Sequence, residues 1–434
     1  MTPENPSPRE FDQAEMPPFA EDALVFRVGN PVEVRHVVNS YNRAEPVIVR
    51  GLGAVLDYVD RFREEGAALT PVYPERALDV MGSESPIPES RWQVAVPDWM
   101  SPRRAMSAYH FLKLATSEKA LGENAALEAK LRVDPLIRLV YHPAIPYAID
   151  LPAQESSQGL SFQWALDKCG FPQAWDCLEY GHDPGPIGVI DMGGNVGHQE
   201  LNAVQVFPPD PCPSTEPHAS AVVGILSAPR NGVGMDGCCS AQVHLYNVAP
   251  AGEFDPAGFI FALKAVTAEK LRVVNVSLEM AYDQLVCDQV RECVDRGMII
   301  VAAMGNRGVP VSYYPAAYDG VIAVGATNRS DVPLNLSNRG THIWLCAPGS
   351  YIETISSATT IDAAHHGTSY ATPMVSAAVW LTLRARPCWK GSQIKSLLAR
   401  SVHQRAQHTN QLGYGRLDMR KLMKELQSAP QCPP

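Results

Sequence analysis

The sequence lacks both a membrane-spanning stretch and a basic tract. No run of apolar residues reaches the roughly 18 needed to cross a bilayer. Lys and Arg total 36 against 46 Asp and Glu, so the formal net charge is −10. Because nucleic-acid binding depends on basic surfaces that neutralise phosphates, this composition argues against a nucleic-acid partner, as the missing apolar run argues against a membrane.

The N-terminus lacks the features of a secretory signal. Residues 1–22, MTPENPSPREFDQAEMPPFAED, are polar, acidic and proline-rich, with neither a basic start nor an apolar stretch. We therefore expect a disordered tail and an intracellular protein. All ten cysteines lie at or after Cys169, and their spacing does not resemble the paired C-x-x-C of a zinc site. Without a signal, buried or free thiols are expected rather than disulfides.

The remaining composition is that of a globular protein with two or three domains. Of the 434 residues, 46% are hydrophobic and 19% charged, which permits a large core. Residues 23–153 predict a small α+β region, with strand-like runs at 23–28, 45–51 and 136–142 and helical stretches at 53–66 and 102–132. A polar linker reaching to Gln163 follows, and we expect a larger domain over 154–425 and a C-terminal tail over 426–434.

The larger region alternates strand-length apolar runs with helical stretches. PIGVID, AQVHLYNV, RVVNVSL, GMIIVAAMG and GVIAVGAT are apolar throughout rather than alternating. Strands that are apolar on both faces are typical of a parallel sheet covered by helices on both sides. In such sheets functional side chains gather beyond the carboxyl ends of the strands.

Four polar residues stand at positions of this kind. Asp191 ends the strand in IGVIDMGG, His218 opens the small-residue stretch HASAVVG, and Asn306 follows the strand in IIVAAMGNRG. Ser369, in HHGTSYATPMVSAAVWL, lies where a helix begins. Singly, these residues are more often a turn aspartate, a structural histidine, a turn asparagine and a helix-capping serine. Together they are the groups that nucleophilic catalysis requires.

The order and local context of these residues resemble the subtilisin-like serine proteases, also called subtilases. GVIDMGG is similar to the aspartate motif, HASAVVG to the histidine motif, AAMGNRG to the oxyanion loop and GTSYATPMVSAA to the serine motif. The resemblance covers about residues 157–425 and runs in the family's order Asp, His, Ser. It implies a three-layer α/β fold with a parallel central sheet, preceded by the smaller α+β region.

The resemblance also implies a mechanism and a substrate. Ser369 would attack a peptide carbonyl, His218 would transfer the proton, and Asp191 would orient the imidazole. Asn306 and the Ser369 N–H would bind the oxyanion. A protein or peptide substrate would lie as an added strand beside residues 275–280, contacting Ser277 and Leu278. The chemistry needs no cofactor.

Several positions depart from the family pattern. Met192, Ala219–Ala221 and His366 replace common choices without removing a catalytic group, and the roles of His366 and Tyr370 cannot be derived. Glu279 stands where glycine is usual, beside the S1 pocket. This pocket holds the side chain of the P1 residue, which is the substrate residue whose carbonyl is attacked. Glu279 would select a basic P1 residue or point to solvent. Tyr313 stands where the family usually has a small residue, and it would favour a small P1 residue.

A structural calcium ion is common in the family near the histidine helix. The motif alignment places Glu200 and Asn231 as two ligands, with Gln158 a third, and oxygen ligands suit calcium. The alternative is that these are ordinary surface residues.

The leading functional prediction is a serine endopeptidase. The region before residue 157 would be a pro-region that inhibits the enzyme intramolecularly and is removed by self-cleavage, or a permanent recognition domain. The alternative function is a pseudoprotease that holds peptides in the cleft. An α/β esterase is disfavoured because its order is Ser, Asp, His and its serine stands in GxSxG.

Overall fold

The computed structural model describes the larger domain almost completely and parts of the N-terminal region. The described residues are 23–28, 53–62, 64, 67–71, 109–114, 118–133, 137–141, 163–178, 181–194, 198–201, 204–207, 217–249, 256–357, 359–403 and 407–432. The expected N-terminal tail, the expected strand at 45–51 and most of the expected linker lie outside these residues.

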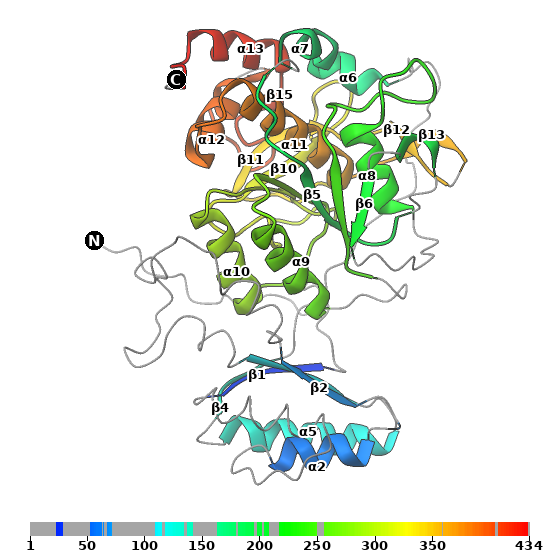
Figure 1. The fold of residues 1–434 in the computed structure, drawn as a ribbon, viewed down its shortest axis with the longest axis vertical. Coiled ribbons are helices and arrows are strands. Elements are labelled where there is room, and N and C mark those ends of the chain that lie inside the picture. Colours follow the sequence, from blue (N-terminus) through cyan, green and yellow to red (C-terminus); the bar gives the residue numbers. More distant parts are fainter. Residues whose placement is uncertain are drawn as a thin grey trace.

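The N-terminal elements form a four-stranded antiparallel sheet with two helices. In chain order they are β1 (Ala23–Val28), α2 (Gly53–Phe62), β2 (Ala68–Pro71), β3 (Tyr109–Lys113), α5 (Glu118–Val133) and β4 (Ile137–Tyr141). The strand order is β2-β3-β1-β4, and both helices cover the same face of the sheet (Figure 1). This β-α-β-β-α-β connection is the split βαβ arrangement.

The apolar spacing of α2 explains why it packs on this sheet. Its buried residues Val55, Tyr58, Val59 and Phe62 recur every three or four positions and so lie on one side of the helix. One expectation was wrong: the single helical stretch at 102–132 contains the strand Tyr109–Lys113. That strand pairs with β1 and β2, and this non-local pairing overrides the local helical pattern.

The larger domain is built on a nine-stranded sheet in the order β14-β15-β11-β10-β9-β8-β5-β7-β6. Every pairing in it is parallel except that between β14 and β15. Its strands are β5 (Ile187–Asp191), β6 (Val204–Phe207), β7 (Val243–Asn247), β8 (Val273–Val276), β9 (Ile299–Ala303), β10 (Ile322–Thr327), β11 (Ile343–Pro348), β14 (Val402–His403) and β15 (Arg416–Leu417).

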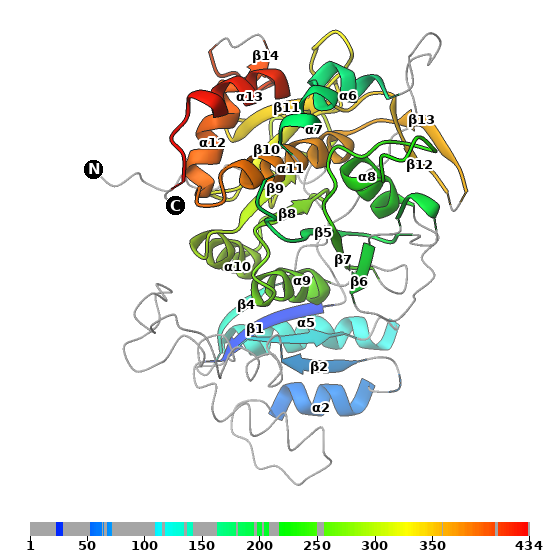
Figure 2. The same ribbon diagram turned by 45° about the horizontal axis from the view of Figure 1, so that its top comes forward.

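Helices cover both faces of this sheet, as Figures 1 and 2 show. One layer holds α6 (Trp164–Cys169), α7 (Phe171–Leu178), α8 (His218–Ser227), α11 (Thr368–Ala385), α12 (Gly391–Arg400) and α13 (Met419–Ser428), and the other holds α9 (Pro256–Ala268) and α10 (Gln284–Asp295). Alternate strand residues supply the two cores: Val301 packs in the first, and its neighbours Ile300 and Ala302 in the second. The expected three-layer α/β fold with a parallel sheet is confirmed.

The parallel pairing places three polar residues at the carboxyl ends of neighbouring strands. Asp191 is the last residue of β5, Ser277 follows β8, and Asn306 follows β9 by three residues. These strands are adjacent and point the same way, so their carboxyl ends lie together. The helices α8 and α11 begin with His218 and Thr368 and pack against each other over this sheet.

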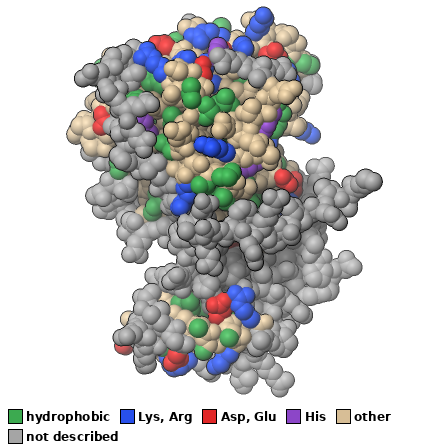
Figure 3. Space-filling model, turned by 180° about the vertical axis from the view of Figure 1, so that it is seen from behind, with side chains coloured by type: hydrophobic (Ala, Val, Ile, Leu, Met, Phe, Trp, Pro, Cys, Tyr) green, Lys and Arg blue, Asp and Glu red, His purple; other side chains and the backbone are tan. Residues whose placement is uncertain are grey.

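None of the helices among the described residues is both long and apolar enough to span a membrane. On the face drawn in Figure 3, basic and acidic side chains of the described residues are interspersed rather than segregated.

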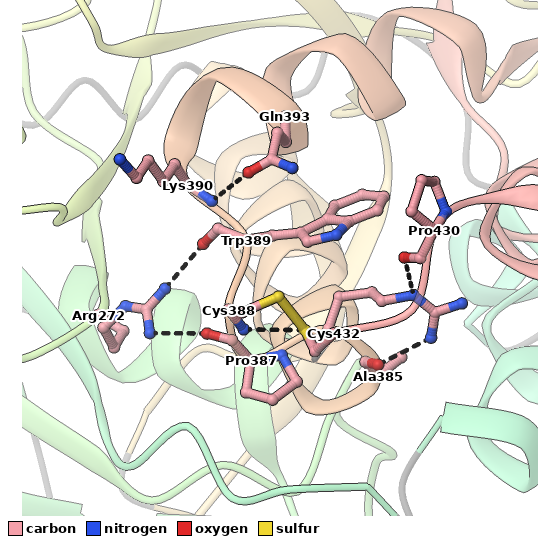
Figure 4. Close-up of a disulfide and its surroundings, with 10 residues drawn as sticks. Arg272, Ala385, Pro387, Cys388, Trp389, Lys390, Gln393, Pro430 and Cys432 are labelled. Carbon is pink, nitrogen blue, oxygen red and sulfur yellow. Dashed lines mark hydrogen bonds between the residues drawn. A yellow bond between two sulfur atoms is a disulfide. The ribbon is translucent and has the colours of Figure 1, made fainter. Parts of the chain in front are cut away.

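The C-terminal residues are ordered by a helix and a disulfide. Residues 426–434, expected to form a tail, begin inside α13, and Cys432 is bonded to Cys388 in the segment between α11 and α12 (Figure 4). The expectation of thiols only was therefore wrong for this pair, whose partners lie 44 residues apart in sequence. Disulfides of this kind form and persist in oxidising environments.

We predict that the Cys388→Ser/Cys432→Ser double variant loses about 2–4 kcal/mol of unfolding free energy, because the cross-link restricts the unfolded chain. Denaturant unfolding measures this, with Cys177→Ser, at an exposed free cysteine, as the control. Equal stability of the double variant and wild type, after mass spectrometry has shown the bond in wild type, would contradict the prediction.

Candidate active site

A buried aspartate–histidine pair connects β5 with α8. Asp191 and His218 are 0% and 1% exposed, and His218 Nδ1 lies 2.7 Å from Asp191 Oδ1. The same carboxylate oxygen accepts a hydrogen bond from the Met192 N–H at 2.7 Å. Because an ionised carboxylate only accepts, the pair places the proton on Nδ1 and makes Nε2 the proton acceptor of a neutral imidazole.

Ser369 lies in the first turn of α11 and is linked to the residues after β8. Its hydroxyl donates to the Ser277 carbonyl at 3.1 Å, and the Ser277 hydroxyl donates back to the Ser369 carbonyl at 3.0 Å. Asn275 extends this network, donating to Ser277 Oγ and accepting from Ser376. The Ser369 N–H belongs to the helix start, where amides have no intrahelical partner.

The start of α11 fixes the orientation of the Asn306 amide. Its Oδ1 accepts hydrogen bonds from both the N–H and the hydroxyl of Thr368, each at 2.8 Å. A backbone N–H can only donate, so this contact assigns the oxygen and the nitrogen of the amide. The nitrogen lies against Gly367, where a Cβ would come within 2.7 Å of it. Glycine at this position therefore keeps space for the amide nitrogen beside Ser369.

Tyr370 forms one wall of the histidine site. It is fully buried, and its ring centroid lies 5.9 Å from that of His218. Its hydroxyl is 3.3 Å from His365 Nδ1, and His365 in turn pairs with Asp362 at 3.2 Å. The sequence could not assign Tyr370, because its contacts come from α8 and from β13 (Ile361–His365). We identify it as a packing residue for the imidazole.

His366, the other unassigned neighbour of the serine motif, points away from this wall. Its ring packs on Tyr351 with centroids 4.4 Å apart, and its Nδ1 lies 3.3 Å from the Ser350 hydroxyl. It therefore has a packing role between the loop after β11 and the start of α11.

The unusual residues after His218 are explained by packing. Ala219 and Ala221 are 0% and 1% exposed, and the Ala221 carbonyl accepts a hydrogen bond from Thr354 at 2.6 Å. Thr354 lies in β12 (Ile352–Ile355), which forms a hairpin with β13 beside α8 (Figure 2). Small side chains let α8 approach this hairpin and α11 closely, and they leave the Asp191–His218 contact intact.

The expected substrate-binding residues Ser277, Leu278, Glu279 and Tyr313 are all buried. Leu278 is 1% exposed and packs in the core with α9 and α10, so only its backbone can face a substrate. Ser277 is the partner of Ser369, while Glu279 and Tyr313 are both buried. The alternative that Glu279 points to solvent is wrong, because its carboxylate pairs with Arg307 and Asn338.

The expected calcium ligands lie near one turn. Glu200, in the short helix Gln199–Leu201, is 2% exposed, and its Oε2 has no hydrogen-bond partner among the described residues. The turn that follows Asn231 passes directly over it, since a Cβ at Gly234 would overlap Glu200 Oε1. Burial and the nearby Asp236 raise the pKa of Glu200.

These oxygens suit a hard cation, although the set is small. Asn231 Oδ1 accepts a hydrogen bond from the Val233 N–H at 2.9 Å, and Gln158 lies outside the described residues. Among the residues that the structure describes, no group of three or more His, Cys, Asp or Glu side chains could hold a metal. Any cation here would therefore depend on backbone carbonyls in addition to Glu200 and Asn231.

Comparison with known proteins agrees with this geometry. The model of the subtilase family matches residues 187–415, which include all four polar loci. The chain is 29% identical over 287 residues to the alkaline protease of Shouchella clausii, covering 63% of this chain and 72% of that protein. It is 30% identical over 224 residues to subtilisin E of Bacillus subtilis (strain 168), covering 49% and 58% of the two.

Two solved structures share the fold. The prenylagaramide maturation protease PagA has a TM-score of 0.53 and 20% identity, covering 59% of this chain and 98% of that one. The self-cleaved protease domain of PatA has a TM-score of 0.51 and 21% identity, covering 58% and 99%.

Proposed function

The chain belongs to the subtilase family, and from this we propose that it is a serine endopeptidase that hydrolyses peptide bonds in protein or peptide substrates. The observation that carries the proposal is the buried Asp191–His218 pair, 2.7 Å long, beside the helix start that bears Ser369. The family's relatives named above are proteases, which supports a peptide substrate for this chain.

In the proposed mechanism, Ser369 Oγ attacks the peptide carbonyl carbon while its proton passes to His218 Nε2. Before attack the hydroxyl rotates away from the Ser277 carbonyl that it now contacts. The carbonyl oxygen becomes an oxyanion that accepts hydrogen bonds from Asn306 Nδ2 and the Ser369 N–H. Asp191 stabilises the imidazolium, which then protonates the leaving amine, and water hydrolyses the acyl-enzyme by the same route.

We predict that a serine-directed fluorophosphonate labels purified protein at Ser369 and that the protein cleaves a peptide library. His218→Ala and Ser369→Ala should abolish both. Asn306→Ala should lower kcat by about 10²–10³ with little change in KM, a range that comes from subtilisin itself rather than from this structure.

Circular dichroism of each variant controls for folding, and peptide mapping locates the label. Folded wild type that neither labels nor cleaves, even after removal of the N-terminal region, would instead favour a pseudoprotease that only holds peptides.

We propose further that the N-terminal region inhibits the enzyme and is removed by self-cleavage within Ala153–Gln163. Its last strand, β4, is at an edge of the N-terminal sheet and directly precedes the segment that leads to this linker. A strand and tail so placed would enter the substrate cleft by lying beside residues 275–280. The solved structure of PatA, which has a similar fold, is that of a self-cleaved protease domain, and this supports the proposal.

Intact mass spectrometry of freshly purified protein tests self-cleavage. We expect wild type to lose its N-terminal region on incubation and Ser369→Ala to keep it. An unchanged wild-type mass, in a preparation that turns over a peptide, would mean that the N-terminal region is a permanent domain.

We also propose that Glu200 and Asn231 hold a structural calcium ion, as an aid to stability and not to the chemistry. The Glu200 carboxylate is buried, and its Oε2 has no hydrogen-bond partner in the part of the chain that the structure describes. This supports the proposal, because a cation would offset the cost of burying that charge. With free calcium at 100 times the Kd of the site, binding would stabilise the fold by about 2.7 kcal/mol.

Thermal unfolding with calcium or with a chelator measures this stabilisation. We expect calcium to raise the Tm of wild type, and Glu200→Gln to remove the response. Glu269→Gln, on the opposite side of the sheet, should retain it. A calcium-independent Tm in wild type, with no heat of binding by calorimetry, would show that these are ordinary polar residues.

A further inference from the structure

The proposed function requires a space for the P1 side chain. With the attacked carbonyl between Ser369 Oγ and Asn306 Nδ2, the P1 residue lies between the backbone after β8 and the loop after β9. Glu279 and Arg307 are the residues that directly follow Leu278 and Asn306 on these two segments. Their state therefore decides what kind of P1 residue fits.

Glu279 is already fully engaged within the protein. It is 2% exposed, its Oε1 lies 3.3 Å from Arg307 Nε, and its Oε2 accepts a hydrogen bond from Asn338 Nδ2 at 3.2 Å. The carboxylate lies so close to the oxyanion loop that a Cβ at Gly305 would overlap it. To bind a basic P1 residue, Glu279 would have to exchange an internal arginine for one from the substrate.

Tyr313 contacts this pair from a third segment. Its side chain is 0% exposed, and the Arg307 guanidinium lies over its ring, 5.6 Å from the centroid. The next residue, Tyr314, exchanges two backbone hydrogen bonds with Met280, at 2.8 and 3.0 Å. This pairing fixes the Tyr313 segment against the strand beside which the substrate would lie.

The three side chains thus contact one another in series. Tyr313 lies beneath Arg307, and Arg307 is paired with Glu279. An aromatic or long aliphatic P1 side chain would have to displace the tyrosine from a closely packed interior, which tolerates added volume poorly. An acidic P1 residue would approach Arg307 next to the Glu279 carboxylate and be repelled by it.

We propose that Glu279, Arg307 and Tyr313 together close the P1 pocket, so that the enzyme cleaves after small residues such as glycine and alanine. This inference rests on the proposed peptidase function. It also decides between the two opposing expectations, because Glu279 balances an internal arginine and does not select a basic residue, whereas Tyr313 limits size.

Peptide substrates that differ only at P1 test this proposal. For wild type we expect kcat/KM to be at least about 10-fold higher with glycine or alanine than with leucine, phenylalanine, lysine or glutamate, since pocket fit is worth 10–200-fold per group. A wild-type preference for phenylalanine, lysine or glutamate would overturn the proposal.

Two variants should change the preference in different directions. Tyr313→Gly should raise kcat/KM for the phenylalanine substrate by at least about 10-fold by opening the base of the pocket. Arg307→Ala, at a side chain 31% exposed and therefore easier to replace, should raise kcat/KM for the lysine substrate by releasing Glu279 Oε1. Arg291→Ala, at an exposed arginine of α10, is the matched control and should keep the wild-type profile.

A small fluorophosphonate without a P1 side chain separates failure of this inference from failure of the proposed function. Labelling of Ser369 together with an unchanged P1 profile in both variants would reject the closed pocket and leave the peptidase intact. Absence of labelling in wild type and in both folded variants, even after removal of the N-terminal region, would reject the peptidase, and the pocket inference with it.

Discussion

The arrangement of the site depends on one junction, where the start of α11 meets the residues that follow β8 and β9. Ser369 and Ser277 exchange hydrogen bonds across it, and Thr368 donates twice to Asn306. On the helix side these bonds use the Thr368 N–H, the Thr368 and Ser369 hydroxyls and the Ser369 carbonyl. The first N–H groups of a helix have no partner within the helix. The contacts that satisfy the helix end therefore also hold Ser369 and Asn306 at this junction.

The sheet makes this junction possible because its strands are parallel. The ends of β5, β8 and β9 lie side by side, so Asp191, Ser277 and Asn306 meet although they are far apart in the chain. Helix α8 then brings His218 from the adjoining layer to within 2.7 Å of Asp191. Its small residues allow that approach, and Tyr370 packs against the open side of the imidazole. Departures from the family pattern around His218 are thus matters of packing.

Neighbouring groups also satisfy one another in the proposed P1 pocket. A carboxylate on the substrate strand and an arginine on the oxyanion loop neutralise each other, and a buried tyrosine supports the arginine. A buried charge without a partner is costly, so Glu279 would be unfavourable at this place without Arg307 and Asn338. The proposed P1 preference consequently depends on three segments together, and no one substitution describes it.

The sequence by itself determined the parallel three-layer fold, the family and the four polar loci, because apolar strand runs and short motifs are local patterns. It did not determine that Tyr109–Lys113 forms a strand, that Cys388 pairs with Cys432, or that Glu279 faces Arg307 and Asn338. Each of these depends on a partner distant in the chain, and local propensity carries no information about such partners. Only the tertiary structure, by bringing them within bonding distance, decided which role each residue has.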